Sequence, residues 1–365
     1  MKKYNLMIVG NGFDIAAGNK TAYAEFIEYL KENDMKSPLV DFFISAYEQK
    51  FFSNDEWNGF ECLLCQYLDF LNSLFEDKFV EKTFFEKKGG NKNQKEYRIT
   101  IKDISDQVDD WRQLFYLKNP LQGKLNFYFE ESLDKPTLKP FTGLDKNSKV
   151  KKLVGIVDVF FSPPNLTDKS VLNYLLIELD ERLNDFEKQL KEYIKSATEE
   201  NEGEIINVLC DSEIETAISF NYSHTIKKYY TIQDDSIAFV NGDVESNIIL
   251  GVEPEMLSAE SIKENPSFRR FFKKYRRIKK CCNQNYNKKI IDVLSNDSII
   301  AIFGHSLDLS DKSILEPIFK KKYKRYDVYC YKKTEEYIKK LDKLIGLDYF
   351  DELRNEGRIN FIITE

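Results

Sequence analysis

The first thirty residues constrain the fold most strongly, because they run from strand to glycine turn to helix. Residues 4–9 form an apolar, strand-like segment, and Gly10-Asn11-Gly12 follows at once. Apolar residues at positions 23, 26, 27 and 30 then predict a helix, which Thr21 is placed to cap. Such glycines let a backbone approach a ligand, and the helix N-terminus offers unpaired N–H groups to a phosphate. Because Ile15 replaces the third glycine of the dinucleotide fingerprint, a tight turn without a ligand explains the segment equally well.

Strand candidates return only in the C-terminal part of the chain. They lie at residues 205–210, 217–220, 238–241, 248–251, 298–304, 326–331 and 359–363. Helical patterns at 269–282, 313–321 and 335–344 separate several of them, and this alternation indicates a mainly parallel sheet covered on both faces. We therefore predict an α/β protein with a Rossmann-like core.

The stretch between the first strand and the later ones has a different pattern. Two long amphipathic helices are predicted at 56–75 and 171–197, and the polar residues 86–97 predict an exposed loop. We expect a discontinuous core of residues 1–33 and 203–365, interrupted by a mostly helical inserted region at 34–202.

Composition excludes several classes of protein. The chain has 61 acidic and 54 basic residues, for a net charge of -7, and no apolar run is long enough for a membrane-spanning helix. The N-terminal apolar segment is too short for a secretion signal, so we expect a cytoplasmic protein with reduced thiols. Because the chain has two histidines and its six cysteines lack zinc-site spacing, we expect neither a metal site nor a disulfide.

Polar residues gather where three of the later predicted strands end. They are Asn221, Tyr222, Ser223, His224 and Thr225 after the first, Asn241, Gly242 and Asp243 after the second, and Gly304, His305 and Ser306 after the third. Ligands of open parallel sheets bind outside the carboxyl ends of the strands, so these ends predict a nucleotide-type site. Alternatively, the polar residues after 220 simply cap the next helix.

These motifs together resemble those of the AbiH family of bacterial abortive-infection proteins. The resemblance rests on Gly10-Asn11-Gly12-Phe13-Asp14, Thr21-x-Tyr23-x-x-Phe26, Trp57-x-x-x-Glu61, Phe220-Asn221-Tyr222-Ser223-x-Thr225, Ile249-Leu250-Gly251 and Phe303-Gly304-His305-Ser306-Leu307. It implies an anti-phage effector with a phage-derived trigger.

The family is in turn similar to sirtuin-like NAD-binding proteins, several of which destroy NAD during phage defence. This similarity implies that Gly10 and Gly12 meet the dinucleotide phosphates and that Asn221 lies beside the nicotinamide ribose. Gly304 and Ser306 would meet the adenosine half. The implied ligand is NAD or a related nucleotide, and the binding residues are Gly10, Asn11, Gly12, Phe13, Asp14, Thr21, Asn221, Tyr222, Gly242, Gly304, His305 and Ser306.

The chain departs from the sirtuin-like pattern where that pattern carries catalysis. The expected catalytic histidine is Asn241 here, and Ser223 stands where an aspartate is common. Cleaving an N-glycosidic bond needs a carboxylate to stabilise an oxocarbenium-like transition state. The candidate catalytic residues are Asn221, Asp14, His305, Asn241 and Glu61, and NAD glycohydrolase-type activity is left open. Taken alone, Glu61 is more simply a surface glutamate on an amphipathic helix.

A basic run at residues 268–280 supports an alternative, a non-enzymatic defence protein. Eight Lys and Arg residues fall within twelve positions and alternate with aromatic residues at helical spacing. Such a helix could bind nucleic acid or, with the insertion, a phage component. A solvated helix face is the simpler interpretation, and the acidic balance of the chain disfavours nucleic acid. Whether the chain forms a homo-oligomer is left open.

Overall fold

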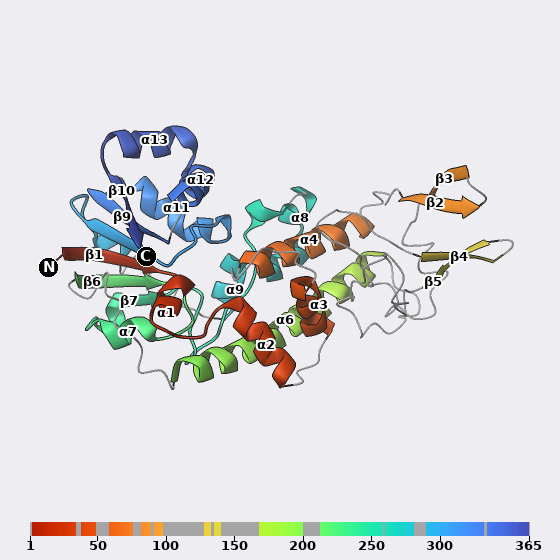
Figure 1. Ribbon diagram of the computed structural model, residues 1–365, viewed down its shortest axis with the longest axis horizontal. Coiled ribbons are helices and arrows are strands. Elements are labelled where there is room, and N and C mark those ends of the chain that lie inside the picture. The colour runs from red at the N-terminus through yellow and green to blue at the C-terminus, as the bar shows by residue number, and fades with distance from the viewer. Residues whose placement is uncertain are drawn as a thin grey trace.

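A computed structural model describes most of the chain. The described residues are 2–33, 38–48, 58–75, 82–88, 91–97, 128–132, 135–139, 168–199, 212–257, 260–280, 290–331 and 334–364. Figure 1 shows a sheet flanked by helices at one end of the molecule and a group of longer helices beside it.

Six strands of the described chain form the central sheet. They are β1 (Lys2–Val9), β6 (Ser212–Ser219), β7 (Ile237–Phe239), β8 (Ile299–Phe303), β9 (Arg325–Tyr331) and β10 (Ile359–Thr364). All neighbours pair in parallel, in the order β10-β9-β8-β1-β6-β7. The chain builds outward from β1 to β7 and then crosses to the other side of β1. This is the 3-2-1-4-5-6 order of Rossmann-like sheets, with its switch point between β1 and β8, so the predicted α/β Rossmann-like fold is confirmed.

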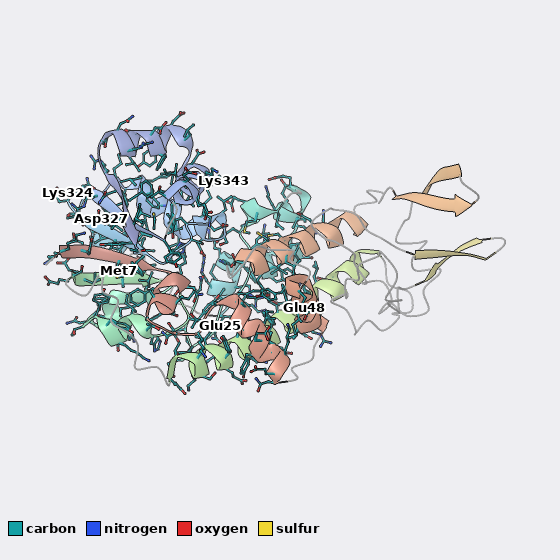
Figure 2. The ribbon with its side chains drawn as sticks, in the orientation of Figure 1. Met7, Glu25, Glu48, Lys324, Asp327 and Lys343 are labelled. Atoms are coloured by element: carbon teal, nitrogen blue, oxygen red, sulfur yellow. The ribbon has the colours of Figure 1, made fainter. Side chains whose placement is uncertain are left out.

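Both faces of the sheet are covered by helices, which explains the continuous apolar strands. On β1, Leu6 and Ile8 pack into the cluster beneath α11 (Lys312–Lys320), α12 (Thr334–Ile345) and α13 (Leu347–Asn355). The intervening Met7 and Val9 pack on the opposite face, against α1 (Asn11–Ala16) and α7 (Thr225–Tyr229). In Figure 2, Met7 and Asp327 lie in this half of the molecule, whereas Glu25 and Glu48 lie among the other helices.

A helical unit with its own apolar core lies beside the sheet. It contains α2 (Tyr23–Glu32), α3 (Pro38–Glu48), α4 (Asn58–Phe75), α6 (Asp168–Glu199), α8 (Glu260–Glu264) and α9 (Lys273–Lys279). Apolar residues of α2, α3, α4 and α6 share one cluster with residues between 244 and 272. The two long predicted helices are thus confirmed as α4 and α6. The predicted domain limits stay a prediction, although α2 packs with the insertion rather than with the sheet.

The inserted region also contains strands that the sequence does not predict. Two antiparallel pairs are present, β2 (Lys82–Lys88) with β3 (Asn91–Tyr97) and β4 (Tyr128–Ser132) with β5 (Lys135–Lys139). The predicted loop at 86–97 is therefore wrong, because a polar sequence without alternating apolar residues gives little strand signal. The predicted strand at 205–210 and Trp57 lie outside the described residues.

Two further predictions around the basic run are wrong. Residues 248–251 form no strand, because their backbone is bound individually: the Leu250 amide donates to the Glu187 carboxylate at 2.6 Å. The predicted helix at 269–282 is broken at Phe272, whose extended backbone (φ -76°, ψ 127°) bridges to Val252. A 3₁₀ helix, η5 (Pro266–Phe271), precedes the break and α9 follows it.

Short 3₁₀ turns complete the connections, namely η3 (Asp234–Ser236), η4 (Pro254–Met256), η6 (Ile291–Val293) and η7 (Leu309–Asp311). Among the helices that the structure describes, none combines the length and apolarity needed to cross a bilayer.

Candidate functional site

Four neighbouring strands end in one row of polar side chains at the switch point of the sheet. The last paired residues of these strands are Val9, Ser219, Phe239 and Phe303, which share one register. The ladder continues one step further, since the amides of Phe220, Val240 and Gly10 donate to neighbouring strands. The next residues are Asn241, Asn221, Asn11 and His305, in the order β7, β6, β1 and β8. Adjacent parallel strands are about 4.8 Å apart, so these four residues form one edge.

The glycines of this edge are explained by direct packing of two loops. A Cβ on Gly12 would lie 2.8 Å from the Gly304 Cα, and a Cβ on Gly10 would lie 2.6 Å from the His305 Cα. Gly304 also has a φ of +66°, which favours glycine. The alternative of a tight turn that needs no ligand therefore suffices for these residues, and their contact with a nucleotide stays a prediction.

The start of α1 does not have the free amides that the sequence suggests. The Gly12 amide donates to the Gly304 carbonyl at 2.9 Å, and the Phe13 amide donates to the Gly10 carbonyl at 2.8 Å. The expectation of unpaired N–H groups is thus wrong at these two positions. The Phe13 side chain is buried in the sheet core, where its ring meets Phe303 edge-on at 5.9 Å.

Asn11 and Thr21 bind each other rather than cap a helix. The Thr21 hydroxyl donates to Asn11 Oδ1 at 2.8 Å, and Asn11 Nδ2 donates to the Thr21 carbonyl at 3.0 Å. Helix α2 is capped instead by Glu25, whose carboxylate accepts from the Ala22 amide at 2.8 Å. The predicted capping role of Thr21 is wrong, because a hydroxyl before a helix can also bind a distant loop.

Asp14 ends a directional chain of hydrogen bonds. The Ser223 hydroxyl donates to Asp14 Oδ2 at 2.6 Å and lies 2.8 Å from the Thr225 hydroxyl, which accepts from Asn19 at 3.0 Å. Because a hydroxyl has one proton, Ser223 gives its proton to Asp14 and Thr225 gives its own to Ser223. Asp14 Oδ1 is buried and accepts no hydrogen bond from the described residues.

The surroundings of Asp14 shift its acidity. Burial raises the pKa of this carboxyl to about 6, although the hydrogen bond from Ser223 and the nearby Thr225 and Asn221 side chains oppose the rise. A carboxyl with this pKa can take up or release a proton close to neutral pH. The predicted alternative, that Ser223 and Thr225 only cap the next helix, misses their direct link to this carboxyl. Asn221 lies in the same row and close enough to Asp14 to lower its pKa.

The second carboxyl of interest, Glu61, is buried and reaches the strand ends. It lies on α4 with 6% of its surface exposed, and its Oε1 is 2.5 Å from Lys273 Nζ. Lys273 Nζ is also 2.9 Å from Asp311 Oδ1, and Asp311 Oδ2 is 3.4 Å from His305 Nε2. The interpretation of Glu61 as a surface residue is therefore wrong, because a cation from a distant segment compensates its burial.

The buried cluster shifts the pKa values of its two carboxyls, Glu61 and Asp311, in opposite directions. Burial raises the pKa of Glu61 to about 7 against the opposing attraction of Lys273, whereas Lys273 and His305 hold the pKa of Asp311 well below its usual range. Lys273 itself keeps its charge, because Asp311 and Glu61 raise its pKa despite burial. Two carboxyls with different acidity around one lysine are suited to hold and release a proton near neutral pH.

His305 has no free acceptor nitrogen in this arrangement. The Leu307 amide donates to His305 Nδ1 at 2.9 Å, so that nitrogen carries no proton and Nε2–H faces Asp311. The Phe220 ring packs edge-on at 4.2 Å. Leu307 has a left-handed backbone, with φ of 55°, which indicates local strain in this loop. His305 is thus held as a neutral donor rather than as an open base.

The remaining predicted residues lie around the same edge. The Tyr222 hydroxyl donates to the Ile249 carbonyl at 3.2 Å, and burial raises its pKa well above the usual value. Gly242 is buried with a φ of 78°, and Ser306 is half-buried. Burial opposes ionisation of Asp243, but His224 and the backbone amides of 245 and 246 outweigh it and hold its pKa at about 2.

Asn241 is held by an arginine from the basic run. Arg277 Nη2 donates to Asn241 Oδ1 at 2.9 Å, and Arg277 Nε donates to the Val240 carbonyl at 3.0 Å. Nearby Glu253 lies 3.7 Å from the same guanidinium and accepts from the Ser313 hydroxyl at 2.7 Å. These partners could not be found from the sequence, because they come from separate segments that only the fold brings together.

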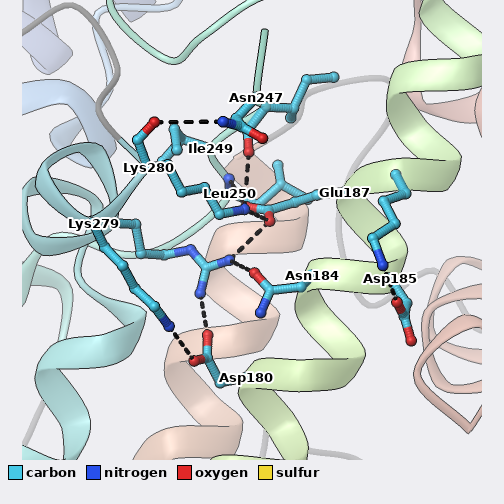
Figure 3. A network of polar contacts seen from close by, with 12 residues as sticks. Asp180, Asn184, Asp185, Glu187, Asn247, Ile249, Leu250, Lys279 and Lys280 are labelled. Carbon is cyan, nitrogen blue, oxygen red and sulfur yellow. Dashed lines mark hydrogen bonds and ion pairs between the residues drawn. The ribbon is translucent and has the colours of Figure 1, made fainter.

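The other side of α9 is bound to α6. Arg276, 1% exposed, lies 2.5 Å from Asp180 and 2.9 Å from Glu187, and Lys280 also pairs with Glu187. Figure 3 shows this network between α6 and the segment that carries Leu250. A solvated basic face is therefore wrong for Lys273, Arg276 and Arg277, whose acidic partners lie far away in sequence.

No group of His, Cys, Asp and Glu side chains in the described ranges has the arrangement of a metal site. Cys62, Cys65 and Cys330, the cysteines in those ranges, form no disulfide; Cys210, Cys281 and Cys282 lie outside the described residues.

Comparison with known proteins identifies the family. Residues 6–150 and 165–332 match the family described as bacteriophage abortive infection AbiH. The chain matches no curated protein and no solved structure. The matched ranges cover most of the chain and include both glycine loops, Glu61 and α9. The chain therefore belongs to the AbiH family of bacteriophage abortive-infection proteins.

Proposed function

We propose that this abortive-infection protein binds NAD or a related nucleotide at the polar edge of its sheet and hydrolyses the N-glycosidic bond. One observation carries the proposal: Asn241, Asn221, Asn11 and His305 form a single row across the switch point. Rossmann-like sheets bind nucleotides in this position.

Two carboxyls support the hydrolytic part of the proposal. Asp14 on α1 and Glu61 on α4 both have pKa values raised toward neutrality by burial. One would stabilise the positive charge that develops on the ribosyl carbon, and the other would take the proton of the attacking water. The Asn241 amide cannot take up a proton at neutral pH and His305 has no free acceptor nitrogen, so the base is a carboxylate rather than the sirtuin-type histidine.

Purified protein should be titrated with NAD by calorimetry and then incubated with NAD while nicotinamide release is followed. We expect binding, and turnover that Asn221→Ala abolishes. Asn221→Ala also removes the side-chain amide that helps to lower the pKa of Asp14, so the melting temperature of the variant is compared with wild type to separate lost binding from a folding defect. Neither binding nor turnover, together with full phage protection by the Asn221 variant, would refute the proposal.

The alternative function is contact with nucleic acid or a phage component through residues 268–280. Fewer basic side chains of this segment are exposed, and so available for such contact, than the sequence suggests. Arg269, Lys274 and Lys279 are exposed, together with parts of Tyr275 and Ile278. Replacing the three basic residues by Gln leaves the cluster of Glu61, Lys273 and Asp311 intact and removes one ion pair outside it, between Lys279 and Asp180. We expect this triple variant to protect against phage as well as wild type does, and loss of protection would favour the alternative.

A further inference from the structure

Arg277 recognises two consecutive residues at the end of β7. Its Nε donates to the Val240 carbonyl and its Nη2 donates to Asn241 Oδ1, at 3.0 and 2.9 Å. A planar guanidinium can make both bonds from one fixed position, which a lysine cannot do. The Arg277 side chain is largely buried, and Glu253 and Asp311 lie within 4 Å of it, so it has little freedom to move.

This contact fixes which way the Asn241 amide points. Arginine has donors only, so the atom that faces Arg277 must be the amide oxygen. The Asn241 Nδ2 group therefore points away from Arg277. Nδ2 donates no hydrogen bond to any of the described residues. Unlike Asp14 Oδ1, it is not fully shielded from solvent.

Asn241 differs from its neighbours in the row, whose side-chain groups are engaged in hydrogen bonds within the protein. Asn11 in the same row spends both ends of its amide on Thr21, and His305 spends Nδ1 on the Leu307 amide. The Asn241 side chain thus has one end held by an arginine, while its other end offers an accessible donor that no described residue uses.

We propose that Arg277 is a positioning residue that makes Asn241 a hydrogen-bond donor, and that the site uses this donor to bind an acceptor oxygen of its ligand. The inference rests on the proposed function, in which this oxygen is a carbonyl or phosphate oxygen of the nucleotide. Residue 241 then selects the ligand and orients it, whereas a histidine at this position would take up a proton.

Asn241→Asp tests the inference with almost no change in shape. The carboxylate keeps the contact with Arg277 but has no proton to donate, and it repels an acceptor oxygen. We expect NAD affinity, measured by calorimetry, to fall on the order of tenfold to a hundredfold. The melting temperature should not fall, because the contact with Arg277 becomes an ion pair. Asn247→Asp, at an exposed position, introduces the same charge and should bind NAD as wild type does.

Arg277→Lys provides the second test. It should weaken NAD binding in the wild-type background but have little further effect in the Asn241→Asp background, because the donor is already lost there. A merely structural arginine would give equal effects in both backgrounds. Equal effects, or wild-type affinity in Asn241→Asp, would overturn the inference.

The inference about Asn241 can still be tested if the wild-type protein binds no NAD. The proposed function then fails, and phage plating with the two aspartate variants decides the inference. Loss of protection by Asn241→Asp alone, with wild-type stability, supports an acceptor ligand of another kind. Full protection by that variant refutes the inference.

Discussion

Replacing Asp14 by Asn should change how the stability of the protein depends on pH. The carboxyl is buried, one of its oxygens accepts no hydrogen bond among the described residues, and its pKa rises from 3.8 to about 6 on folding. A raised pKa means that the folded state favours the protonated form. The stability contributed by Asp14 is therefore fully present below pH 3.8 and is lost as the pH rises through about 6.

The size of the effect follows from the shift. About two pKa units at about 1.4 kcal/mol each give about 3 kcal/mol between the two limits. Asn cannot ionise, so the free energy of unfolding of Asp14→Asn, measured relative to wild type, should rise by about this amount between pH 4 and pH 8. Urea denaturation of both proteins across this range measures the difference directly, and other titrating groups cancel.

Asp243 is the matched control, because its pKa is lowered to about 2. Its stabilising contribution is present above pH 3.8 and is lost only as the pH falls through about 2, so Asp243→Asn should show a flat difference between pH 4 and pH 8. A flat or falling difference for Asp14→Asn would refute the reasoning. If Asp14 is kept for chemistry, Asp14→Asn should also lose phage protection while it gains stability above pH 7.

Two further substitutions test the packing that assembles the site. Gly304→Ala would place a Cβ 2.2 Å from the Phe13 amide nitrogen on a left-handed backbone, which should cost about 1–2 kcal/mol for the backbone and about 1–3 kcal/mol for crowding. Gly346→Ala shares the left-handed backbone but meets no atom within 4 Å, so urea denaturation should show only the first cost. Lys273→Met leaves two buried carboxyls without their cation and should lower the free energy of unfolding by about 3–5 kcal/mol. Lys274→Met, one residue along on the exposed side, should change it by less than about 0.5 kcal/mol, and equal losses in the two lysine variants would contradict the buried cluster.

The inner strands β1 and β8 could be predicted because their last four residues are buried on both faces of the sheet. Leu6 to Val9 and Ile300 to Phe303 are continuous apolar runs that end at glycine, and such runs mark parallel strands without any knowledge of their partners. The segment at 248–251 looks the same in sequence but gains its hydrogen bonds from a side chain and a loop. Local pattern cannot distinguish these two cases.

The candidate site could be predicted only where its residues follow strands. Asn221 and His305 follow apolar runs within two residues, and Asp14 follows the glycine turn after β1, so the sequence could place them near the sheet edge. Lys273 and Arg277 were not, because a basic run predicts a solvated face unless its acids are known. Those acids lie on α4 and around η7, and only the tertiary fold brings them to α9.

Helix α9 has a mechanical consequence that follows from its two buried sides. Within eight residues, Lys273 and Arg277 grip the groups at the sheet edge, while Arg276 and Lys280 grip α6. A seven-residue helix is too short to bend between these two sets of contacts, so α9 moves as a rigid body. A displacement of α6 would therefore shift the amide of Asn241 and the carboxyl of Glu61.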